Sequence, residues 1–440
     1  MKNLGRFDYE PVVISATPSD YDGPSELAMP LDRSLEVSIP KGIDVFRVRS
    51  RQPFGLFRFL KKLRLEYIRD LLFVPDSALF WIRPVVKLGE EIAAARPVDV
   101  IYTSVKPHSV AFIGWLLKRR LRKPWVIDFR DPWTQYFLAE FPTKFHFRFE
   151  QMLERFILKR ADHIITITPT ARAQLLEWCD FLSPAKVSVI TNGYDEDEFK
   201  EDPVESSGQE HFSKNGHFSI VYSGVFCGAP IAGTRGESRI EAAWRAMRRR
   251  LAFAPRHFER IAHSPKFLLD ALSELFKEQP ELRGKVRLVH VGPFDESNRV
   301  YVRQLGIPET IVAKGYVSHS EAVRLVKEAD SLFLCLADSP AGERNDCVPQ
   351  KVYEYLGSRR PILALVPHGD ARDFLQEGGT AVICNPRDVD EIKRGLLSLL
   401  ALHDKEEVLK PNNDFIRRFK RSELTRQLAV IFDSVIANNN

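Results

Sequence analysis

Residues 346–365, DCVPQKVYEYLGSRRPILAL, decide the fold, because a helical pattern there leads directly into an apolar run. Pro349 suits the first turn of a helix, where its missing N–H removes no hydrogen bond, and Gly357 lies near the predicted end. The run PILALV (361–366) has no polar alternation, which is typical of a strand covered on both faces in a parallel sheet. The stretch therefore predicts one helix–strand unit of a doubly wound α/β domain.

The same alternation of short apolar runs and helical patterns extends along most of the chain. Strands are predicted at 10–17, 43–50, 98–105, 124–129, 163–168, 186–191, 218–224, 286–292, 310–317, 331–337, 361–366 and 380–385. Helices are predicted between several of them, for example at 108–121, 145–161, 265–279 and 320–329, and the stretch 413–439 predicts one amphipathic helix. This repetition of βαβ units is typical of Rossmann-like domains.

A polar segment with Pro, Gly and Ser, residues 200–217, divides the strands into two series and predicts a linker. The expected fold class is therefore α/β, with two Rossmann-like domains. In such an arrangement the carboxyl ends of the two sheets face each other across a central cleft, which is where ligands of open parallel sheets bind.

Composition excludes several classes of protein. The 440 residues are 44% hydrophobic and 28% charged, which is globular, and the net charge of +5 is far from the profile of a nucleic-acid binder. A mild positive charge suits anionic small ligands, an anionic membrane surface or a solvated exterior. The five cysteines are not spaced as a zinc or redox site, and the chain has neither a signal-peptide pattern nor an apolar run of spanning length. We expect a cytoplasmic protein without a membrane span.

Two charged residues stand close together on the helix that follows Pro349. Lys351 and Glu354 are i,i+3 neighbours and share one face. A helix N-terminus with a lysine attracts phosphate, and a carboxylate one turn later can accept hydrogen bonds from two sugar hydroxyls. Asp346 precedes Glu354 by eight positions. The alternative is an exposed helix on which Lys351 and Glu354 form only a salt bridge.

In residues 346–365 an acidic residue is followed by seven others and then by a glutamate that lies within KVYEYLGSRRPILAL. This pattern resembles the retaining glycosyltransferases of family 4, which have the GT-B fold. Other segments are similar to that family in the same order: VIDFRDPW (126–133), ADHIITITPTARAQLLE (161–177), VSVITNGYDEDEF (187–199) and FSIVYSG (218–224). The resemblance covers about Glu10 to Leu400. It implies an acceptor domain at 1–200, a linker at 201–217, a nucleotide-sugar-binding domain at 218–410 and a C-terminal helix, 411–440, that packs back on the first domain.

The resemblance also implies roles for individual residues. Glu354 would hold the ribose of the donor, and Asp346 would stand near the donor sugar, although it is one methylene shorter than the family's usual glutamate. Lys351 would offset the charge on the leaving diphosphate, so that no metal or other cofactor is expected. The family's further phosphate-binding arginine and lysine fall in an apparent insertion, where Arg235 and Lys266 are the candidates. The family's lysine aligns nearer to His263 than to Lys266.

Charged residues also follow two strands of the N-terminal half. Arg130, in DFRDPW, stands where many members of the family carry a histidine that contacts the donor sugar. An arginine stays protonated, so its role would be electrostatic, and with Asp128 and Asp131 it forms either part of the cleft or a structural network. His108, in TSVKPHS, either faces the cleft or caps the next helix, and we favour the cap.

Three further stretches have two interpretations each. The segment 51–83 mixes Phe, Leu and basic residues, which fits either a membrane-surface helix or an amphipathic helix packed on the sheet. The acid pairs in DEDE (195–198) and DVD (388–390) could bind a metal, but solvation or helix capping suits their settings better. We therefore expect no metal site.

By this resemblance the sequence starts after the family's first buried strand and glycine-rich turn, which predicts two strands with an unpaired edge in the N-terminal sheet. The function that we expect is transfer of a sugar from a nucleotide-diphosphate donor to a polysaccharide or lipid-linked acceptor, in the cytoplasm or on the inner face of the cytoplasmic membrane. The alternatives are a degenerate sugar-nucleotide-binding or scaffold protein and a nucleotide-sugar epimerase.

Overall fold

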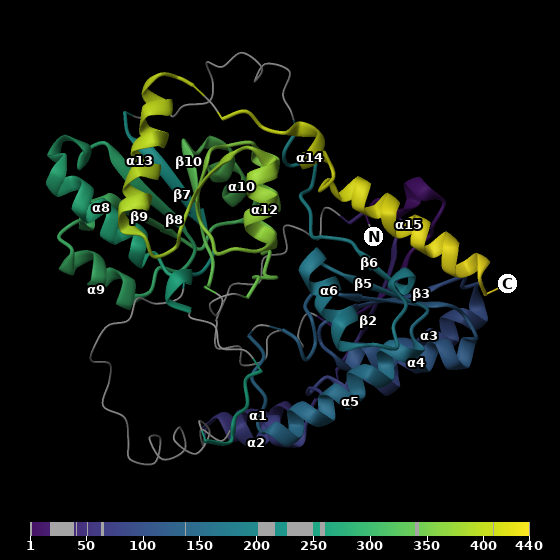
Figure 1. Ribbon diagram of the computed structural model, residues 1–440. Helices are drawn as coiled ribbons and strands as arrows, with labels where there is room; N and C mark the ends of the chain where they lie inside the picture. Colours follow the sequence, from purple (N-terminus) through teal and green to yellow (C-terminus); the bar gives the residue numbers. More distant parts are fainter. Residues whose placement is uncertain are drawn as a thin grey trace.

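The structure is a computed structural model (Figure 1), and it describes residues 2–17, 39–40, 42–50, 52–62, 66–136, 138–200, 216–226, 250–255, 260–338, 343–407 and 409–439. Most of the predicted linker at 201–217 and most of the apparent insertion, including Arg235, lie outside these residues. The described part holds two groups of parallel strands, each flanked by helices, which confirms the α/β fold class.

The C-terminal half contains one six-stranded parallel sheet with the order β12-β11-β10-β7-β8-β9. Its strands are β7 (Phe218–Ser223), β8 (Val286–Val291), β9 (Ile311–Gly315), β10 (Ser331–Cys335), β11 (Ile362–Leu365) and β12 (Ala381–Cys384), which confirms all six predicted strands of this half. Every residue of β10 and β11 is buried, as their continuous apolar runs predict.

Helices cover both faces of this sheet. They are α8 (Lys266–Glu278), α9 (Glu296–Gln304), α10 (His319–Glu328), α11 (Gln350–Ser358), α12 (Asp370–Gly378) and α13 (Val389–Asp404). One hydrophobic cluster packs α8 and α13 on one face, and a second packs α10, α11 and α12 on the other. The predicted helix before PILALV is α11, which ends at Arg359 in a left-handed conformation.

The N-terminal half contains two separate parallel sheets. Strands β3 (Ile101–Val105), β4 (Trp125–Phe129), β5 (His163–Thr166) and β6 (Val187–Val189) follow one another in one sheet, while β1 (Val12–Ala16) pairs with β2 (Asp44–Val48). Among the described residues β1 pairs only with β2, and β3 only with β4. Side chains of β1 and β2 still pack against the core of the larger sheet, through Ile14, Ala16 and Val48.

The helices of this half are α1 (Phe54–Lys62), α2 (Glu66–Leu72), α3 (Leu79–Ala95), α4 (Ser109–Leu121), α5 (Lys144–Arg160) and α6 (Pro169–Trp178). The stretch 51–83 is thus divided among three helices. Short 3-10 turns lie at Leu4–Phe7, Pro184–Lys186, Arg260–His263, Pro280–Leu282 and Pro308–Thr310. Within the described ranges, none of the helices combines the length and the hydropathy needed to cross a bilayer.

The prediction of one helix over 413–439 was wrong. The chain forms α14 (Asn413–Arg417) and α15 (Arg421–Ala437), because the backbone between them pairs with Tyr194 instead of continuing the helix. The N–H of Tyr194 donates to the carbonyl of Phe419 at 3.0 Å, and the N–H of Arg421 donates to the carbonyl of Tyr194 at 3.0 Å. Beyond this break, α15 packs Leu428, Phe432 and Val435 against Val126 and Ile165 of the N-terminal sheet (Figure 1).

Candidate active site

The carboxyl ends of the two larger sheets meet. Thr168, which follows β5, donates from its hydroxyl to the carbonyl of Asp346, which lies between β10 and α11, at 3.4 Å. Thr170 donates from its N–H and its hydroxyl to the carboxylate of Asp370, after β11, at 3.0 and 2.8 Å. Ligands of open parallel sheets bind at these ends. Asp346 lies at this junction, and α11, which carries Lys351 and Glu354, begins four residues later.

Lys351, in the first turn of α11, lies against the end of β7. Its Nζ donates to the hydroxyl of Tyr222 at 2.7 Å and lies 3.9 Å from the centre of the same ring. Burial lowers the pKa of Lys351 from 10.5 to about 8. Among the residues that the structure describes, no carboxylate forms an ion pair with Lys351, so the predicted alternative of a Lys351–Glu354 salt bridge does not hold. A largely buried cation without a counter-ion favours an anionic ligand.

Two glycines bring backbone close to this cation. Gly224, which follows β7, has φ +139°, and a Cβ at this position would lie 2.8 Å from the Nζ of Lys351. Gly292, which follows β8, has φ +133°, and a Cβ there would lie 2.3 Å from the carbonyl oxygen of Gly224. Side chains at these positions would therefore fill the space beside the lysine. The free N–H groups at the start of α11 add positive potential at the same point.

The other candidate cations do not join Lys351. Lys266 forms an ion pair with Asp270 on its own helix at 2.5 Å and lies near the ring of Tyr301. Arg235 lies outside the described residues. His263 is the residue near Lys351: burial lowers its pKa to about 4, and the charge of Lys351 contributes to the shift. At neutral pH His263 is therefore a neutral hydrogen-bonding group in this position.

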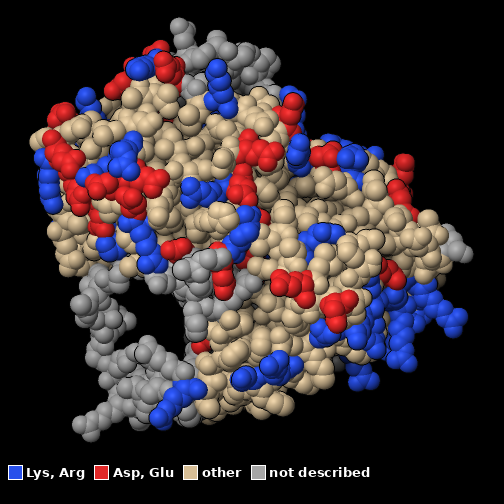
Figure 2. All heavy atoms as spheres, viewed as in Figure 1, with Lys and Arg blue, Asp and Glu red and all other residues tan. Residues whose placement is uncertain are grey.

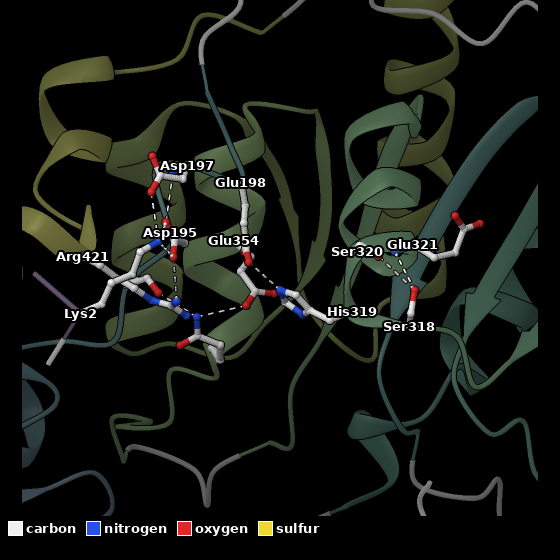
Figure 3. A network of polar contacts seen from close by, with 12 residues as sticks. Lys2, Asp195, Asp197, Glu198, Ser318, His319, Ser320, Glu321, Glu354 and Arg421 are labelled. Carbon is white, nitrogen blue, oxygen red and sulfur yellow. Dashed lines mark hydrogen bonds and ion pairs between the residues drawn. The ribbon is translucent and has the colours of Figure 1, made fainter. Parts of the chain in front are cut away.

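Glu354 lies one turn beyond Lys351 on α11. The side-chain amide of Gln350 donates to the Glu354 carboxylate at 3.1 Å and to the carbonyl of Gly193 at 2.8 Å. Figure 3 shows Glu354 converging with Glu198 and His319, and the imidazole of His319 lies 2.8 Å from the carboxylate of Glu198. His319 follows β9, so this group also gathers at the carboxyl ends of the strands. Sequence reasoning missed Glu198 and His319 as members of the site.

Asp346 is buried, with 4% of its surface exposed. It lies in a loop that a hydrogen bond between the residues on either side of it stabilises. The Asn345 side chain accepts a hydrogen bond from the N–H of Cys347 at 2.8 Å. Burial raises the pKa of the Cys347 thiol to about 12, and the charges of Asp346 and Asp131 contribute to the shift. Asp131, from the N-terminal half, therefore lies near the Asp346 loop of the C-terminal half.

The structure corrects the predicted role of Asp128 as a cleft residue. Asp128 is 3% exposed, and its carboxylate accepts a hydrogen bond from the hydroxyl of Tyr102 and forms an ion pair with Arg130 at 3.2 Å. Burial raises the pKa of Asp128, while Arg130 and Tyr102 oppose the shift. Arg130 also donates to the carbonyl of Ile190 at 2.6 Å. The two residues form the structural network that the sequence left as an alternative. In this network the ion pair with Asp128 holds the Arg130 side chain in place.

The favoured interpretation of His108 as a helix cap was wrong. Its side chain makes no capping hydrogen bond, because the carboxylate of Asp76 accepts from the N–H and hydroxyl of Ser109 instead. The imidazole stacks on Trp133, with ring centres 4.6 Å apart, and burial lowers its pKa to about 3. His108 is therefore neutral and supports the loop that carries Asp131.

Two buried glutamates on α5 hold the same loop, and sequence reasoning missed them. Glu150 accepts from the indole N–H of Trp133 at 2.8 Å, and Glu154 accepts from the hydroxyl of Thr134 at 2.5 Å. Burial raises the pKa of each carboxyl to about 7. Trp133 and Glu154 also line a small pocket with Phe129, Thr166 and Gln174, at the carboxyl ends of β4 and β5.

The acid pairs considered as metal ligands have other partners. Asp388 caps α13 by accepting from the N–H of Glu391, as predicted. Asp195 forms ion pairs with Lys2 at 3.0 Å and Arg421 at 3.3 Å, which Figure 3 shows. It is thus neither solvated nor a simple cap. Over the ranges that the structure describes, no group of three or more His, Cys, Asp or Glu side chains could hold a metal ion.

The contact between the two halves makes a testable contribution to stability. Asp370 is 2% exposed and binds both Thr170 and Arg344. We expect Asp370→Asn to lower the free energy of unfolding by about 1–2 kcal/mol, because a buried charged hydrogen bond is lost. Urea unfolding measures the change. Asp373→Asn is the matched control, since its carboxylate also pairs with Arg344 but is 48% exposed, and should change stability by less than ~0.5 kcal/mol. Equal effects of the two variants would contradict this interpretation.

Comparison with known families gives two matches. A model described as "Glycosyl transferase 4-like domain" matches residues 1–193, and one described as "Glycosyl transferases group 1" matches residues 248–402. No curated protein matches the sequence.

Several solved structures share the fold. A glycosyltransferase from Rickettsia africae has a TM-score of 0.58 at 14% identity, with 99% of this chain and 93% of that chain covered. Sucrose-phosphate synthase from Thermosynechococcus elongatus has a TM-score of 0.56 at 14% identity, over 91% and 85% of the two chains. HepE from Anabaena, in complex with UDP, has a TM-score of 0.52 at 16% identity, over 91% and 88%.

Proposed function

Because the chain belongs to the glycosyltransferases of the family-4 type and has the GT-B fold, we propose that it transfers a sugar from a nucleotide diphosphate to a hydroxyl of a polysaccharide or lipid-linked glycan, with retention of anomeric configuration. The donor class follows from both matched domains. The acceptor class and the stereochemistry are the parts that we propose.

One observation carries the assignment of the donor site. Lys351 is a half-buried cation at the N-terminus of a helix, beside two glycine turns and one helical turn from a carboxylate. A diphosphate on Lys351 would supply the counter-charge that the described residues do not, and Glu354 could then accept hydrogen bonds from both ribose hydroxyls. The UDP in HepE supports a uridine nucleotide as the first ligand to test.

The chemistry proposed for these residues is stabilisation of the leaving group. When the bond between the sugar C1 and the diphosphate oxygen breaks, its electron pair stays on the diphosphate. In this proposal, Lys351 and the free N–H groups of α11 stabilise the negative charge that grows there. The acceptor hydroxyl forms the new bond to C1 on the same face of the sugar, if configuration is retained, and its proton passes to the leaving diphosphate oxygen. We place the acceptor on the N-terminal side, near Asp131, and Asp346 near the donor sugar.

The experiment that tests the function is a transfer assay with a panel of nucleotide sugars and glycan acceptors. We expect release of the nucleoside diphosphate that depends on the acceptor, together with a new glycosidic product. Nucleotide binding without any release would instead support the competing proposal, a non-catalytic sugar-nucleotide-binding or scaffold protein. Incubation with the donor alone, followed by analysis of the recovered sugar, tests for epimerase activity.

Metal removal is a separate prediction. Because Lys351 and the tip of α11 can supply the positive charge that the leaving diphosphate needs, we expect treatment with EDTA to change the transfer rate by less than about twofold. The control is a parallel reaction with added Mg²⁺. A large loss of rate that Mg²⁺ restores would show that a metal performs this role instead.

We place the enzyme in the cytoplasm, in peripheral contact with the inner face of the cytoplasmic membrane. A lipid-linked glycan would be presented there, and the surface described next supports this contact.

A further inference from the structure

Helix α5 has an unusual distribution of side chains. Its two acidic residues, Glu150 and Glu154, face inward and are 7% and 2% exposed. Its outward-facing positions carry Phe145, Phe149 and Met152, which are 73%, 38% and 55% exposed. The spacing i, i+4, i+7 places these three on one side of the helix. A helix on the surface of a globular protein normally has the opposite arrangement, with charges outside and aromatic side chains inside.

The exposed apolar side chains continue onto neighbouring helices. Helix α2 contacts the start of α5, because the imidazole of His146 lies 3.2 Å from the carbonyl of Leu71 and the hydroxyl of Tyr67 donates to the carbonyl of Pro142. Leu72, the last residue of α2, is 65% exposed. On α1, which contacts α2, Leu56 and Phe59 are also exposed. Figure 1 shows the three helices together at the lower edge of the molecule.

The exposed charges of α5 are all positive. They are Lys144, Arg148, Lys159 and Arg160, and both acids of the helix are buried. At its C-terminal end, α5 adjoins the basic end of α4, because Lys118 donates to the carbonyl of Arg160 at 2.8 Å. That end of α4 carries Arg119, Arg120 and Arg122. Figure 2 shows Lys and Arg gathered at the lower right, where Figure 1 places α3 and α4.

We propose that this surface, formed by the outer side of α5 with Leu56 and Phe59 of α1 and Leu72 of α2, docks onto an anionic lipid bilayer. Exposed Phe, Leu and Met beside Lys and Arg match the two parts of such a surface, the acyl boundary and the negative headgroups. A second copy of the chain is a poor partner, because a symmetric dimer would place the cations of one α5 against those of the other.

Docking here would orient the candidate active site. The buried side of α5 holds Trp133 and Thr134, which belong to the same loop as Asp131. One helix therefore links the docking surface to the acceptor side of the site, and an α-helix with its side chains is about 10 Å thick. The use of this surface to reach a lipid-linked acceptor rests on the proposed function, whereas the docking itself rests on the geometry of α5.

The test is co-sedimentation of the full chain with vesicles of phosphatidylcholine alone, or with about one third phosphatidylglycerol. We expect binding to the anionic vesicles that weakens as salt is added. The double variant Phe145→Ser/Phe149→Ser should reduce the partition coefficient at least about tenfold. The double variant Lys144→Glu/Arg148→Glu should reduce it by a similar factor. Val430→Ser, at a 56% exposed position on α15, is the matched control and should bind as the wild type does.

Two further measurements keep the outcomes separate. Thermal unfolding and nucleotide affinity should be unchanged in these variants, since the side chains are exposed and lie outside the candidate site. Failure of nucleotide binding in the wild type would therefore contradict the proposed function without affecting the docking proposal. The docking proposal is overturned if wild-type protein ignores anionic vesicles, or if the Phe145→Ser/Phe149→Ser variant binds them normally. It is also overturned if that variant converts a wild-type dimer into a monomer.

Discussion

Lys351→Met is expected to weaken binding of a nucleoside diphosphate by at least about 100-fold while leaving the fold intact. The lysine is the buried cation nearest the two glycine turns, and methionine fills a similar volume without charge. Isothermal titration calorimetry with UDP measures the affinity. Lys266→Met is the control, because Lys266 pairs with Asp270 and should change the affinity by less than about threefold. If Lys266→Met gave the larger loss, the anion site would have been assigned to the wrong cation.

The same variant should be more stable than the wild type at neutral pH. Because the pKa of Lys351 falls from 10.5 to about 8 on folding, the folded state prefers the neutral amine. The stability that this preference contributes is present above pH 10.5 and is lost as the pH falls through about 8. Below that pH the wild type carries a desolvated charge that Lys351→Met lacks. We therefore expect the free energy of unfolding of the variant to exceed that of the wild type by ~1 kcal/mol or more. Loss of stability instead would indicate that Lys351 has a structural anionic partner.

Glu354→Ala is expected to reduce UDP affinity by at least about 100-fold and to leave the binding of inorganic diphosphate unchanged. The carboxylate would lose two charge-assisted hydrogen bonds to ribose, each worth about 1.5–3 kcal/mol. Gln350, its neighbour, keeps its bond to the carbonyl of Gly193, so α11 should remain in place. Glu377→Ala, at an exposed position of α12, serves as the matched control.

Comparison of the two ligands separates the roles of the two residues. Lys351→Met should weaken both UDP and inorganic diphosphate, whereas Glu354→Ala should weaken only UDP. An unchanged UDP affinity in Glu354→Ala would show that the ribose lies elsewhere, and the neighbouring pair of Glu198 and His319 would become the next candidate.

Most of the fold could be predicted from the sequence because its signals are local. Buried parallel strands need continuous apolar runs, and runs such as PILALV have few other structures available. The helix carrying Lys351 and Glu354 is equally local, since Pro349 favours its start. The match between the two domain models and the expected family follows from the same segments.

The errors arose where distant residues decide the structure. The break between α14 and α15 depends on backbone pairing with Tyr194, more than two hundred positions away along the chain. His108 fails to cap α4 because Asp76 already occupies that role. The sequence of α5 has aromatic residues on several sides of the helix. The spacing of its apolar residues alone therefore could not show that Glu150 faces Trp133 while Phe145 faces outward.

The pH dependence of UDP affinity tests the central claim most directly, because it reports on the charge of the lysine that is proposed to receive the diphosphate. Titrations between roughly pH 7.5 and 9.5 keep the terminal phosphate of UDP more than about 90% in its doubly charged form, because its second pKa is about 6. We predict a constant affinity up to about pH 8, the pKa of Lys351 in the free protein, and about a tenfold fall per pH unit well above it. Lys351→Met should show weak binding without this fall. An affinity in the wild type that stays constant across the whole range, or no UDP binding at all, would contradict the account.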